Sequence, residues 1–375
     1  MSLAESQTER ASGLDAALMP SSTQTPRKPS ETGLTLNRSI GPWEATPSTQ
    51  PEGFKTRTRC LHPADKRIVK FPAQDFVTHH SFQIAHCAAC GFDVTSPQPS
   101  IETIGAYYPE GYYGKPEERR FPPLVEALQK LLYAQRVRMV ESVAGRRRGR
   151  VLDVGCGRGL LLQAFHRRGW EVQGTELSDQ AARYAREVAG VAVETGCVED
   201  IKFPEAHFDV VTMWHVLEHV HDPRVVLAEV SRILKPGGVL LVGVPNFSGF
   251  EARFFKDKWF HLDVPRHVTH LTKSMLKSVL SENGFQECRW SGFAPEYDAF
   301  SFVQSVLNWC GLRPNLLYNV LRGKQAKVIA EGAPRWQVAL SLALGALFGI
   351  LSVPVTLVAG LAGQAGTMTV LATKR

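Results

Sequence analysis

Two carboxylates that flank a glycine-rich turn form the clearest chemical pattern in this sequence. Asp153 lies near the end of an apolar run, and Gly155, Gly157 and Gly159 follow it at every second position. Glycines allow the backbone to approach a ligand closely, where a Cβ would clash. A carboxylate such as Asp153 can accept a hydrogen bond from an ammonium group but would repel a pyrophosphate. The turn therefore favours a nucleoside that carries an amino acid over a dinucleotide.

Glu176 strengthens this prediction because it ends the next apolar run, about twenty residues further along the chain. A carboxylate at that place in a doubly wound fold accepts hydrogen bonds from ribose hydroxyls. A glycine turn alone is weak evidence, because packing alone can require it. Together with the acid at the end of the second strand, the turn predicts a cofactor site at the carboxyl edge of a parallel sheet.

Short apolar runs alternate with helical stretches from residue 150 onward, which is the pattern of βαβ units and of a parallel sheet. An amphipathic helix near residues 124–143 precedes this region, and further helices are expected at 179–188, 223–234 and 273–282. The expected strands cover residues 151–154, 171–175, 191–194, 208–213, 239–244, 285–290 and 367–373.

Further motifs lie at residues 196–200, 207–211, 213–220 and 234–238. With the glycine turn, they make residues 150–292 and the last strand resemble the class I S-adenosylmethionine-dependent methyltransferases. The branch that this sequence resembles contains ubiquinone-biosynthesis O-methyltransferases and bacterial cell-envelope methyltransferases. The resemblance implies an α/β fold with a Rossmann-like, doubly wound, mostly parallel seven-stranded sheet and an antiparallel last strand. It also implies S-adenosyl-L-methionine as the cofactor.

The same resemblance assigns roles to individual residues around the cofactor. Asp153, Gly155 and Gly157 would hold the methionine part, and Glu176 would hold the ribose. Val198 and Glu199 would line the adenine pocket. The complete set of expected cofactor-binding residues is Asp153, Gly155, Cys156, Gly157, Gly159, Glu176, Leu177, Val198, Glu199 and Trp214.

Three residues that follow the fourth expected strand are candidates for catalysis: His215, Glu218 and His219. Methyl transfer from a sulfonium mainly needs alignment and exclusion of water, whereas a hydroxyl acceptor also needs a base or a metal. One interpretation is a divalent-cation site completed by His267 or His270. It resembles the metal site of small-RNA 2′-O-methyltransferases, although His215 stands where those enzymes have an acid. The alternatives are that His215 or His219 is a general base, and that the histidines are structural.

Cysteines in the N-terminal part point to zinc. Cys87 and Cys90 have the spacing of zinc ligands, and Cys60 is a third candidate ligand. Envelope methyltransferases of the branch described above carry an N-terminal zinc ribbon ahead of a tyrosine-rich stretch like residues 107–113. The first knuckle is degenerate here, because Pro63 stands where a second cysteine would be. The alternatives are a structural zinc, completed by one of His79, His80 and His86, and a ribbon-like fold that has lost its metal.

Composition separates the chain into parts and limits its partners. Residues 1–53 are rich in Ser, Thr, Pro and Gln and are expected to form a disordered tail. A formal charge of +7 without a long basic stripe makes nucleic acid an unlikely partner. Scattered cysteines and the lack of an apolar N-terminal run favour a cytoplasmic location. The expected parts after the tail are a zinc-ribbon-like segment (54–114), a linking helix (115–149), the methyltransferase core (150–293), an apolar insertion (294–364) and the last core strand (365–375).

The insertion contains an uncharged apolar stretch at residues 338–361, which by length could cross a membrane. The last strand must return to the sheet, however, and so few residues cannot cross a bilayer twice. We therefore expect a shallow re-entrant hairpin that turns near Pro354, with an interfacial helix at 300–309 upstream. A soluble helical lid or dimer interface and a true span are the alternatives. Cations expected to meet lipid phosphates are Arg313, Arg322, Lys324, Lys327 and Arg335.

Together these patterns predict a methyltransferase on the inner face of the cell membrane, attached peripherally or monotopically. Its expected acceptor is lipid-linked or amphipathic and is methylated at oxygen. One alternative is a soluble small-molecule or sugar methyltransferase with a helical lid. Another is a binding module that keeps the fold without catalysis, against which the presence of both Asp153 and Glu176 argues. The sequence leaves the oligomeric state open.

Overall fold

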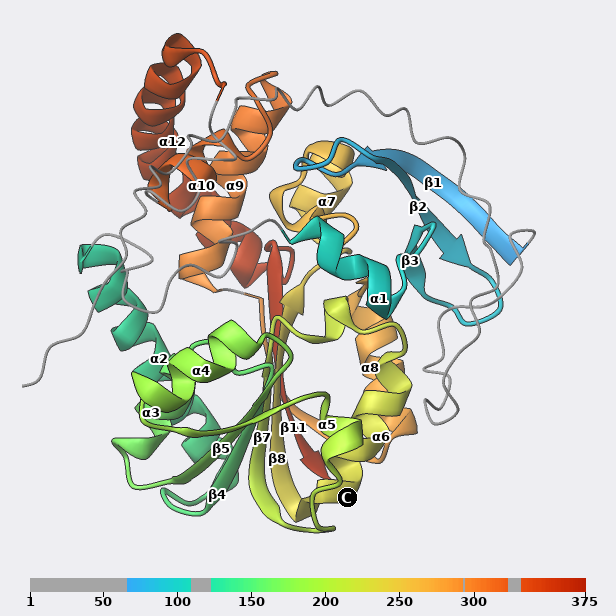
Figure 1. The fold of residues 1–375 in the computed structure, drawn as a ribbon, viewed down its shortest axis with the longest axis vertical. Helices are drawn as coiled ribbons and strands as arrows, with labels where there is room; N and C mark the ends of the chain where they lie inside the picture. The colour runs from blue at the N-terminus through green and yellow to red at the C-terminus, as the bar shows by residue number, and fades with distance from the viewer. Residues whose placement is uncertain (1–65, 109–122, 293, 323–331) are drawn as a thin grey trace, which may run out of the picture. The chain divides into compact units, whose positions relative to one another are not determined.

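A seven-stranded sheet forms the centre of the computed structural model, which describes residues 66–108, 123–292, 294–322 and 332–375 (Figure 1). Its strand order is β10-β11-β8-β7-β4-β5-β6. Strand β11 runs antiparallel to both of its neighbours, and the other paired strands are parallel. The predicted fold class, including the antiparallel last strand, is confirmed. The strands are β4 (Arg150–Val154), β5 (Glu171–Glu176), β6 (Ala192–Thr195), β7 (Phe208–Trp214), β8 (Leu234–Pro245), β10 (Phe285–Ser291) and β11 (Thr367–Lys374).

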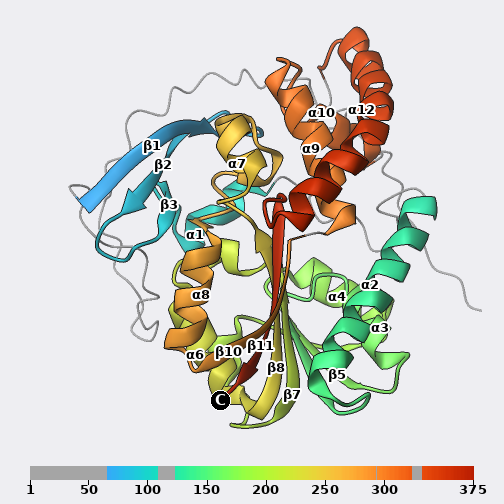
Figure 2. The same cartoon turned by 180° about the vertical axis from the view of Figure 1, so that it is seen from behind.

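Helices cover both faces of this sheet, as the alternating pattern predicts (Figure 2). One face carries α2 (Pro123–Ala144), α3 (Leu160–His166) and α4 (Asp179–Glu187). The other carries α5 (Val198–Ile201), α6 (Pro223–Ile233) and α8 (Lys273–Glu282). Each helical layer buries its own apolar cluster against the sheet. The rigid double layer fixes the carboxyl ends of the strands, where the candidate site lies.

The N-terminal segment forms a second, antiparallel sheet of order β1-β2-β3-β9. Its strands are β1 (Arg67–Gln74), β2 (Ser81–Cys87), β3 (Asp93–Ser96) and β9 (Thr269–His270), and α1 (Ile101–Ile104) and η2 (Gly105–Tyr107) follow β3. The segment is thus joined to the core through β9, a part of the chain far away in sequence. Cys87 is buried and Cys90 follows it in the adjoining turn. Cys60 and the tail at 1–53 lie outside the described residues, so the zinc ligands and the tail stay predictions.

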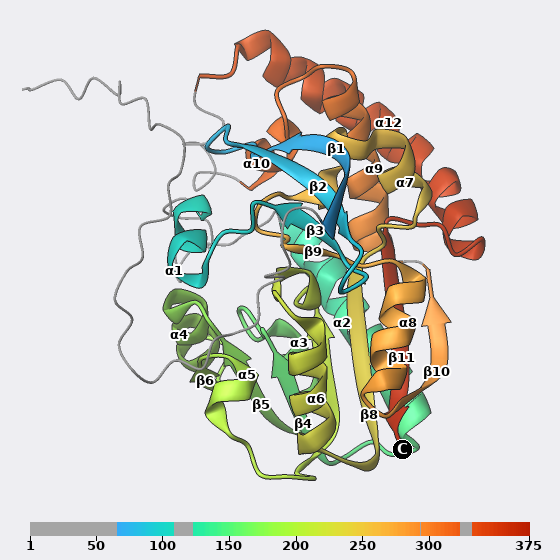
Figure 3. The ribbon, with the colours of Figure 1, turned by 90° about the vertical axis from the view of Figure 1, so that its right-hand side faces the viewer.

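The insertion consists of helices beyond the carboxyl edge of the large sheet (Figure 3). They are α9 (Pro295–Trp309), α10 (Leu316–Leu321) and α12 (Arg335–Leu361), and α9 and α10 pack against α12. Three short elements of the core also lie against α9: α7 (Phe250–Phe255), η4 (Lys256–Lys258) and η5 (Phe260–Leu262). Helix α9 therefore joins the insertion to α7, η4 and η5 of the core.

The predicted hairpin turn at Pro354 is wrong, because α12 continues through this proline as one helix of 27 residues. A proline inside a helix removes one backbone hydrogen bond. The hydroxyls of Ser352 and Thr356 donate to the carbonyls of Gly349 and Ser352 in the same stretch, and packing against α9 covers this side. Within the described residues, α12 alone is long and apolar enough to cross a membrane.

Two details of the predicted insertion also change. The helix expected at 300–309 begins earlier, at Pro295, and much of it is buried. The side chain of Arg322 is buried rather than exposed, so it cannot meet lipid phosphates as expected. Arg313 is half-buried and Arg335 is exposed. Lys324 and Lys327 lie outside the described residues.

Candidate active site

The predicted cofactor residues gather at the carboxyl ends of four neighbouring strands, β7, β4, β5 and β6. The turn after β4 is built from glycines with positive φ, a conformation that L side chains rarely adopt. A Cβ on Gly155 would lie 2.7 Å from Val216 Cγ2. A Cβ on Gly157 would meet no protein atom within 4 Å. The turn thus leaves open space over Gly157, as a site for a closely held ligand requires.

Asp153 is buried near the end of β4, and its Oδ1 accepts a hydrogen bond of 2.5 Å from the Thr212 hydroxyl on β7. Burial raises the pKa of this carboxyl to about 7, and the neighbouring Glu176 adds to the rise. The Thr212 hydrogen bond and the charge of Arg136 act in the opposite direction. A ligand ammonium group beside Asp153 would favour its ionised form.

Glu176 ends β5 and joins the turn to the next helix. Its two carboxylate oxygens accept hydrogen bonds from Gly157 N at 2.8 Å and from Ser178 N at 2.9 Å. Both contacts fix the carboxylate at the sheet edge while leaving lone pairs for further donors. A carboxylate held in this way beside the open glycine turn suits the recognition of ribose hydroxyls.

Other predicted cofactor residues differ in what their side chains offer. The Cys156 side chain packs inward, and its Sγ would lie 2.7 Å from a Cβ on Gly174. Cys156 therefore shapes the turn rather than presenting its thiol. Val198 is buried at the start of α5, Glu199 beside it is half-buried, and Leu177 is 68% exposed. These three follow β5 and β6 at the edge where an adenine would lie.

The structure adds Arg136, which sequence reasoning missed. Its guanidinium lies over the Trp214 ring, 3.7 Å from the centroid, and the side chain is buried although α2 precedes the sheet. Burial lowers the pKa of Arg136, whereas the charge of Asp153 acts to raise it. An arginine at an apolar position of an amphipathic helix was the available sequence signal. Its cation near Asp153 and Trp214 suits a ligand carboxylate.

The predicted catalytic residues lie together after β7. His215 is positioned at the end of the strand by a backbone hydrogen bond from its N to Gly243 O, and Glu218 and His219 lie on η3 (Leu217–His219). The Nδ1 of His215 lies 2.8 Å from Glu218 Oε1. Burial raises the pKa of Glu218, but the His215 hydrogen bond and the nearby histidines together lower it to about 2. Glu218 is therefore a carboxylate at neutral pH, and His215 Nδ1 is the donor.

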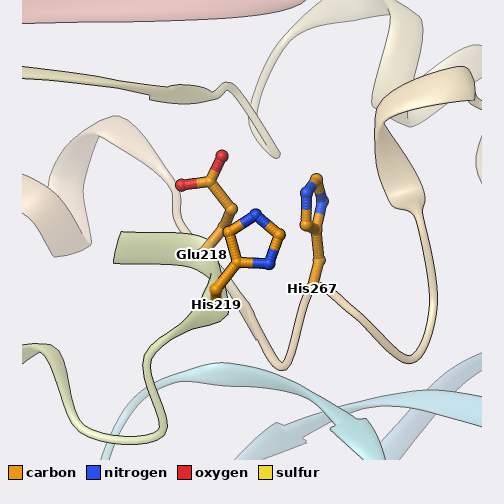
Figure 4. A group of neighbouring side chains, drawn as sticks. All are labelled: Glu218, His219 and His267. Carbon is orange, nitrogen blue, oxygen red and sulfur yellow. The ribbon is translucent and has the colours of Figure 1, made fainter. Parts of the chain in front are cut away.

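Glu218, His219 and His267 form a group whose potential ligand atoms lie within 4.8 Å of one another (Figure 4). His219 Nδ1 lies 2.9 Å from Arg266 O, and His267 Nδ1 lies 2.8 Å from His261 O. Because a carbonyl only accepts, each Nδ1 carries a proton, and Nε2 is the nitrogen whose lone pair can bind a metal in the neutral imidazole. Glu218 Oε2 is buried without a hydrogen-bond partner among the described residues. Two imidazoles and a carboxylate prepared in this way fit a divalent transition metal.

Electrostatics keep His267 in its neutral, ligand form. Burial lowers the pKa of His267 to about 4, and the charge of His219 adds to the fall. Burial likewise lowers the pKa of His270 to about 3. His270 is not part of the group, because its Nε2 lies 2.9 Å from the Thr95 hydroxyl. His267 is therefore the later histidine that the site brings together with Glu218 and His219.

The N-terminal sheet holds the loop that carries His267. Thr95 on β3 donates its hydroxyl to His267 O at 2.6 Å, and its N donates to Val268 O. The buried guanidinium of Arg266 donates to Asp75 Oδ1 and to Tyr107 O, each at 2.8 Å. The segment expected to be a zinc ribbon thus supports the candidate active site, a role that its cysteine spacing does not indicate.

Comparison with known proteins agrees with this geometry. Residues 119–287 match a family model described as a methyltransferase domain. The chain is 41% identical over 117 residues to the ubiquinone biosynthesis O-methyltransferase of Thiobacillus denitrificans, covering 30% of this chain and 50% of that protein. It is 38% identical over 136 residues to the enzyme of the same name from Bordetella avium, covering 34% and 54%. The chain thus spans about half the length of the curated relatives it matches.

Solved structures give a looser likeness. An S-adenosylmethionine-dependent methyltransferase from Mesorhizobium loti aligns with a TM-score of 0.40 at 16% identity, covering 64% of this chain and 96% of that one. Geranyl diphosphate C-methyltransferase from Streptomyces coelicolor aligns with a TM-score of 0.43 at 17% identity, covering 72% and 89%.

Proposed function

We propose, on the premise that residues 119–287 form a class I S-adenosylmethionine-dependent methyltransferase domain, that the chain transfers a methyl group to a hydroxyl oxygen with a divalent cation at the acceptor side. The observation that carries the methyl-donor assignment is the pair Asp153 and Glu176 at the ends of adjacent strands, on either side of an open glycine turn. S-adenosyl-L-methionine has an ammonium group for the first carboxylate and ribose hydroxyls for the second.

The chain's own residues align the donor. Asp153 accepts from the ammonium group, Arg136 neutralises the donor carboxylate, and Glu176 orients the ribose. Trp214 lies under Arg136 and has a buried Nε1 without a hydrogen-bond partner among the described residues. Its ring helps to exclude water from the methyl group, which mainly needs alignment for in-line transfer.

The acceptor side is supported by the Glu218, His219 and His267 group, which lies beside His215 at the end of β7. A divalent cation held there would lower the pKa of an acceptor hydroxyl and make it nucleophilic. His215 holds Glu218 Oε1, which leaves Oε2 without a hydrogen-bond partner among the described residues and available to a cation. His267 reaches the group from a loop that the N-terminal sheet supports.

A general base is the second candidate for the acceptor side. His215 Nε2 is buried without a hydrogen-bond partner in the described part of the chain, while Nδ1 is held by Glu218. A histidine oriented by a carboxylate in this manner can accept a proton through Nε2. In this alternative the reaction proceeds after complete removal of divalent cations.

The first experiment measures binding of S-adenosyl-L-methionine and of its demethylated product to the full chain by calorimetry. We expect micromolar affinity that falls at least ~100-fold in Glu176→Ala, since a buried charged hydrogen-bond acceptor is lost. Glu194→Ala is the matched control, because Glu194 is exposed on the neighbouring strand β6. Absence of binding in the unaltered protein would overturn the methyl-donor assignment.

The second experiment titrates Mn²⁺ into metal-free protein and follows it by electron paramagnetic resonance. Glu218→Gln and His267→Gln should each weaken the site at least ~10-fold, because the first removes the negative charge of a ligand and the second removes an imidazole nitrogen. His221→Gln is the control, since His221 follows the group in sequence and donates elsewhere, to Pro99 O. Equal Mn²⁺ affinity in all variants would exclude the metal and leave the histidine base.

Attachment to a membrane surface is the further part of the proposal, and α12 supports it. Only 17% of the most apolar 18-residue stretch of α12 is buried. Leu347, Ile350 and Leu361 are among its most exposed side chains. Ser352 and Thr356 instead are buried against the protein. A helix with hydroxyls inside and leucines outside suits a lipid environment better than water. An acceptor with an apolar part would be available at such a surface, on the cytoplasmic side.

Vesicle co-sedimentation of the full chain tests this part separately. Leu347→Glu with Ile350→Glu should reduce the bound fraction by at least ~10-fold, because two charges would have to enter the acyl region. Leu131→Glu is the matched control, since Leu131 on α2 is 69% exposed. A soluble lid is favoured if the unaltered chain stays in the supernatant at every lipid concentration.

A further inference from the structure

A second apolar and basic surface lies outside α12 and outside the candidate active site. We call it the α7–α9 edge: Arg253, Phe254, Lys256, Lys258 and Trp309, all exposed. Phe254 is 61% exposed and Trp309 is 59% exposed, and their ring centroids lie 5.9 Å apart. Two large aromatic rings paired in water are unusual, and the three cations lie within four positions of Phe254 in the sequence.

The edge is held in place by the protein beneath it. Phe255, next in sequence to Phe254, is buried and packs edge to face against Phe302 on α9. Trp259, which follows Lys258, is buried in the same apolar cluster. The backbone on both sides of the exposed residues is therefore anchored. Exposure of Phe254 and Trp309 is a feature of the folded surface rather than of a frayed end.

The edge is continuous with α12. Helix α9 packs against both α7 and α12, so the three helices lie side by side (Figure 3). The Arg253 guanidinium donates to Gln364 Oε1 at 2.5 Å, and Phe250 N donates to Gln364 O at 2.9 Å. These contacts join α7 to the residues that directly follow α12. A membrane surface that binds α12 would therefore also lie next to the α7–α9 edge.

The charge of the α7–α9 edge indicates which kind of surface it would bind. Asp257 is the acid within residues 253–258, and its Oδ2 lies 2.8 Å from Lys258 Nζ. Three cations against one acid leave an excess of positive charge in the segment that carries Phe254. Aromatic rings at the headgroup level and cations opposite anionic lipid phosphates are the features of an interfacial contact. A second copy of this chain would bring the same positive charge and be repelled.

We infer that the α7–α9 edge docks on an anionic bilayer surface, with Phe254 and Trp309 at headgroup level and Arg253, Lys256 and Lys258 against lipid phosphates. This inference rests on the membrane attachment proposed for α12. It adds a preference for anionic lipid and a second point of contact. Two contacts along neighbouring helices would fix the rotation of the protein on the membrane, and with it the direction in which the site opens.

The test compares vesicles of neutral phosphatidylcholine with vesicles that contain 30% phosphatidylserine, a composition of about one anionic lipid in three. The full chain is used, with Lys256→Glu/Lys258→Glu and Phe254→Ser/Trp309→Ser as variants. The matched control is Arg167→Glu/Arg183→Glu, two exposed cations on the catalytic core. Melting temperature and S-adenosyl-L-methionine affinity confirm that each variant is folded.

The unaltered chain should bind the anionic vesicles more tightly by roughly 10-fold or more, since each cation near the surface contributes roughly a 5-fold gain. The charge variant should lose this preference, the aromatic variant should bind both vesicles more weakly, and the control should behave as the unaltered chain. Equal binding to both vesicles in every protein would overturn the inference while leaving the α12 attachment intact.

Two other outcomes separate the inference from its premise. Absence of binding by the unaltered chain to either vesicle overturns the attachment itself, and the inference with it. Loss of a concentration-dependent dimer in the aromatic variant, without any change in vesicle binding, would show that the edge is a protein interface. Light scattering of each variant in detergent provides this second measurement.

Discussion

The Nδ1 of His215 lies 2.8 Å from Oε1 of Glu218, while Oε2 of the same carboxylate is buried without a hydrogen-bond partner among the described residues. The histidine thus fixes one oxygen and leaves the other for the group that includes His219 and His267. Ligands of metal ions are oriented by such partners, and the loss of one typically weakens the site 10- to 100-fold. His215 is then a positioning residue rather than a ligand.

A pair of substitutions at His215 distinguishes these roles. In His215→Asn the side-chain amide can still donate to Glu218, whereas His215→Ala removes the donor. If His215 positions Glu218, Mn²⁺ affinity should stay within ~3-fold in the first variant and fall roughly 10-fold or more in the second. Equal affinity in both variants, with loss of methyl transfer in both, would instead identify His215 as the base.

Arg136 should contribute to cofactor affinity although it lies on a helix outside the predicted core. Arg136→Met removes the cation that lies over Trp214 near Asp153, and we expect the dissociation constant of S-adenosyl-L-methionine to rise roughly 10- to 100-fold. Arg138→Met is the control, because Arg138 is exposed on the same helix. Calorimetry measures both. An unchanged constant in Arg136→Met would contradict the assignment of the donor carboxylate.

Cofactor affinity should depend on pH through Asp153. Burial raises the pKa of this carboxyl to about 7, so the neutral form dominates at lower pH, and a neutral acid cannot accept from an ammonium group as a carboxylate does. Affinity should therefore fall as pH decreases below 7, by up to about 10-fold per unit. Asp153→Asn should bind weakly at every pH from 5.5 to 8.5. A flat profile in the unaltered protein would contradict this prediction.

The predicted sheet follows from local signals, because each strand and helix of residues 150–292 carries its own pattern. Strand ends carry the cofactor residues, so the strand order alone places Asp153, Glu176 and Trp214 at one edge of the sheet. Pro354 does not end the helix as its local signal predicts, because α12 packs against α9 along this stretch. Topology limits the number of membrane crossings but does not require a turn.

Contacts between segments that are distant in the chain could not be predicted from the sequence. Thr95 holds the His267 loop from 172 positions away, and no periodicity or motif links two such residues. Arg136 is similar, because an amphipathic helix does not reveal which cation turns inward. The choice of His267 over His270 as the third member of the group also depends on tertiary contacts, since Thr95 engages His270.

Stability should depend on pH through Glu251, which anchors the insertion to the core. Glu251 on α7 is buried, and its Oε2 accepts from the Ser301 hydroxyl on α9 at 2.7 Å. Burial raises the pKa of Glu251 to about 8, and the neighbouring Asp298 adds to this rise despite the hydrogen bond from Ser301. In the unfolded chain the same group titrates near its ordinary value of about 4.3.

The sign of the effect follows from proton counts. Between about pH 4.3 and 8 the folded protein keeps the proton of Glu251 and the unfolded chain has lost it, so the free energy of unfolding falls as pH rises. One such group contributes up to about 1.4 kcal/mol per pH unit. Glu251→Gln should flatten the fall of the melting temperature between pH 5.5 and 8, whereas Glu187→Gln, at an exposed position on α4, should not. If both variants follow the slope of the unaltered chain, Glu251 is ionised in the folded protein, and the insertion is held without a buried neutral acid.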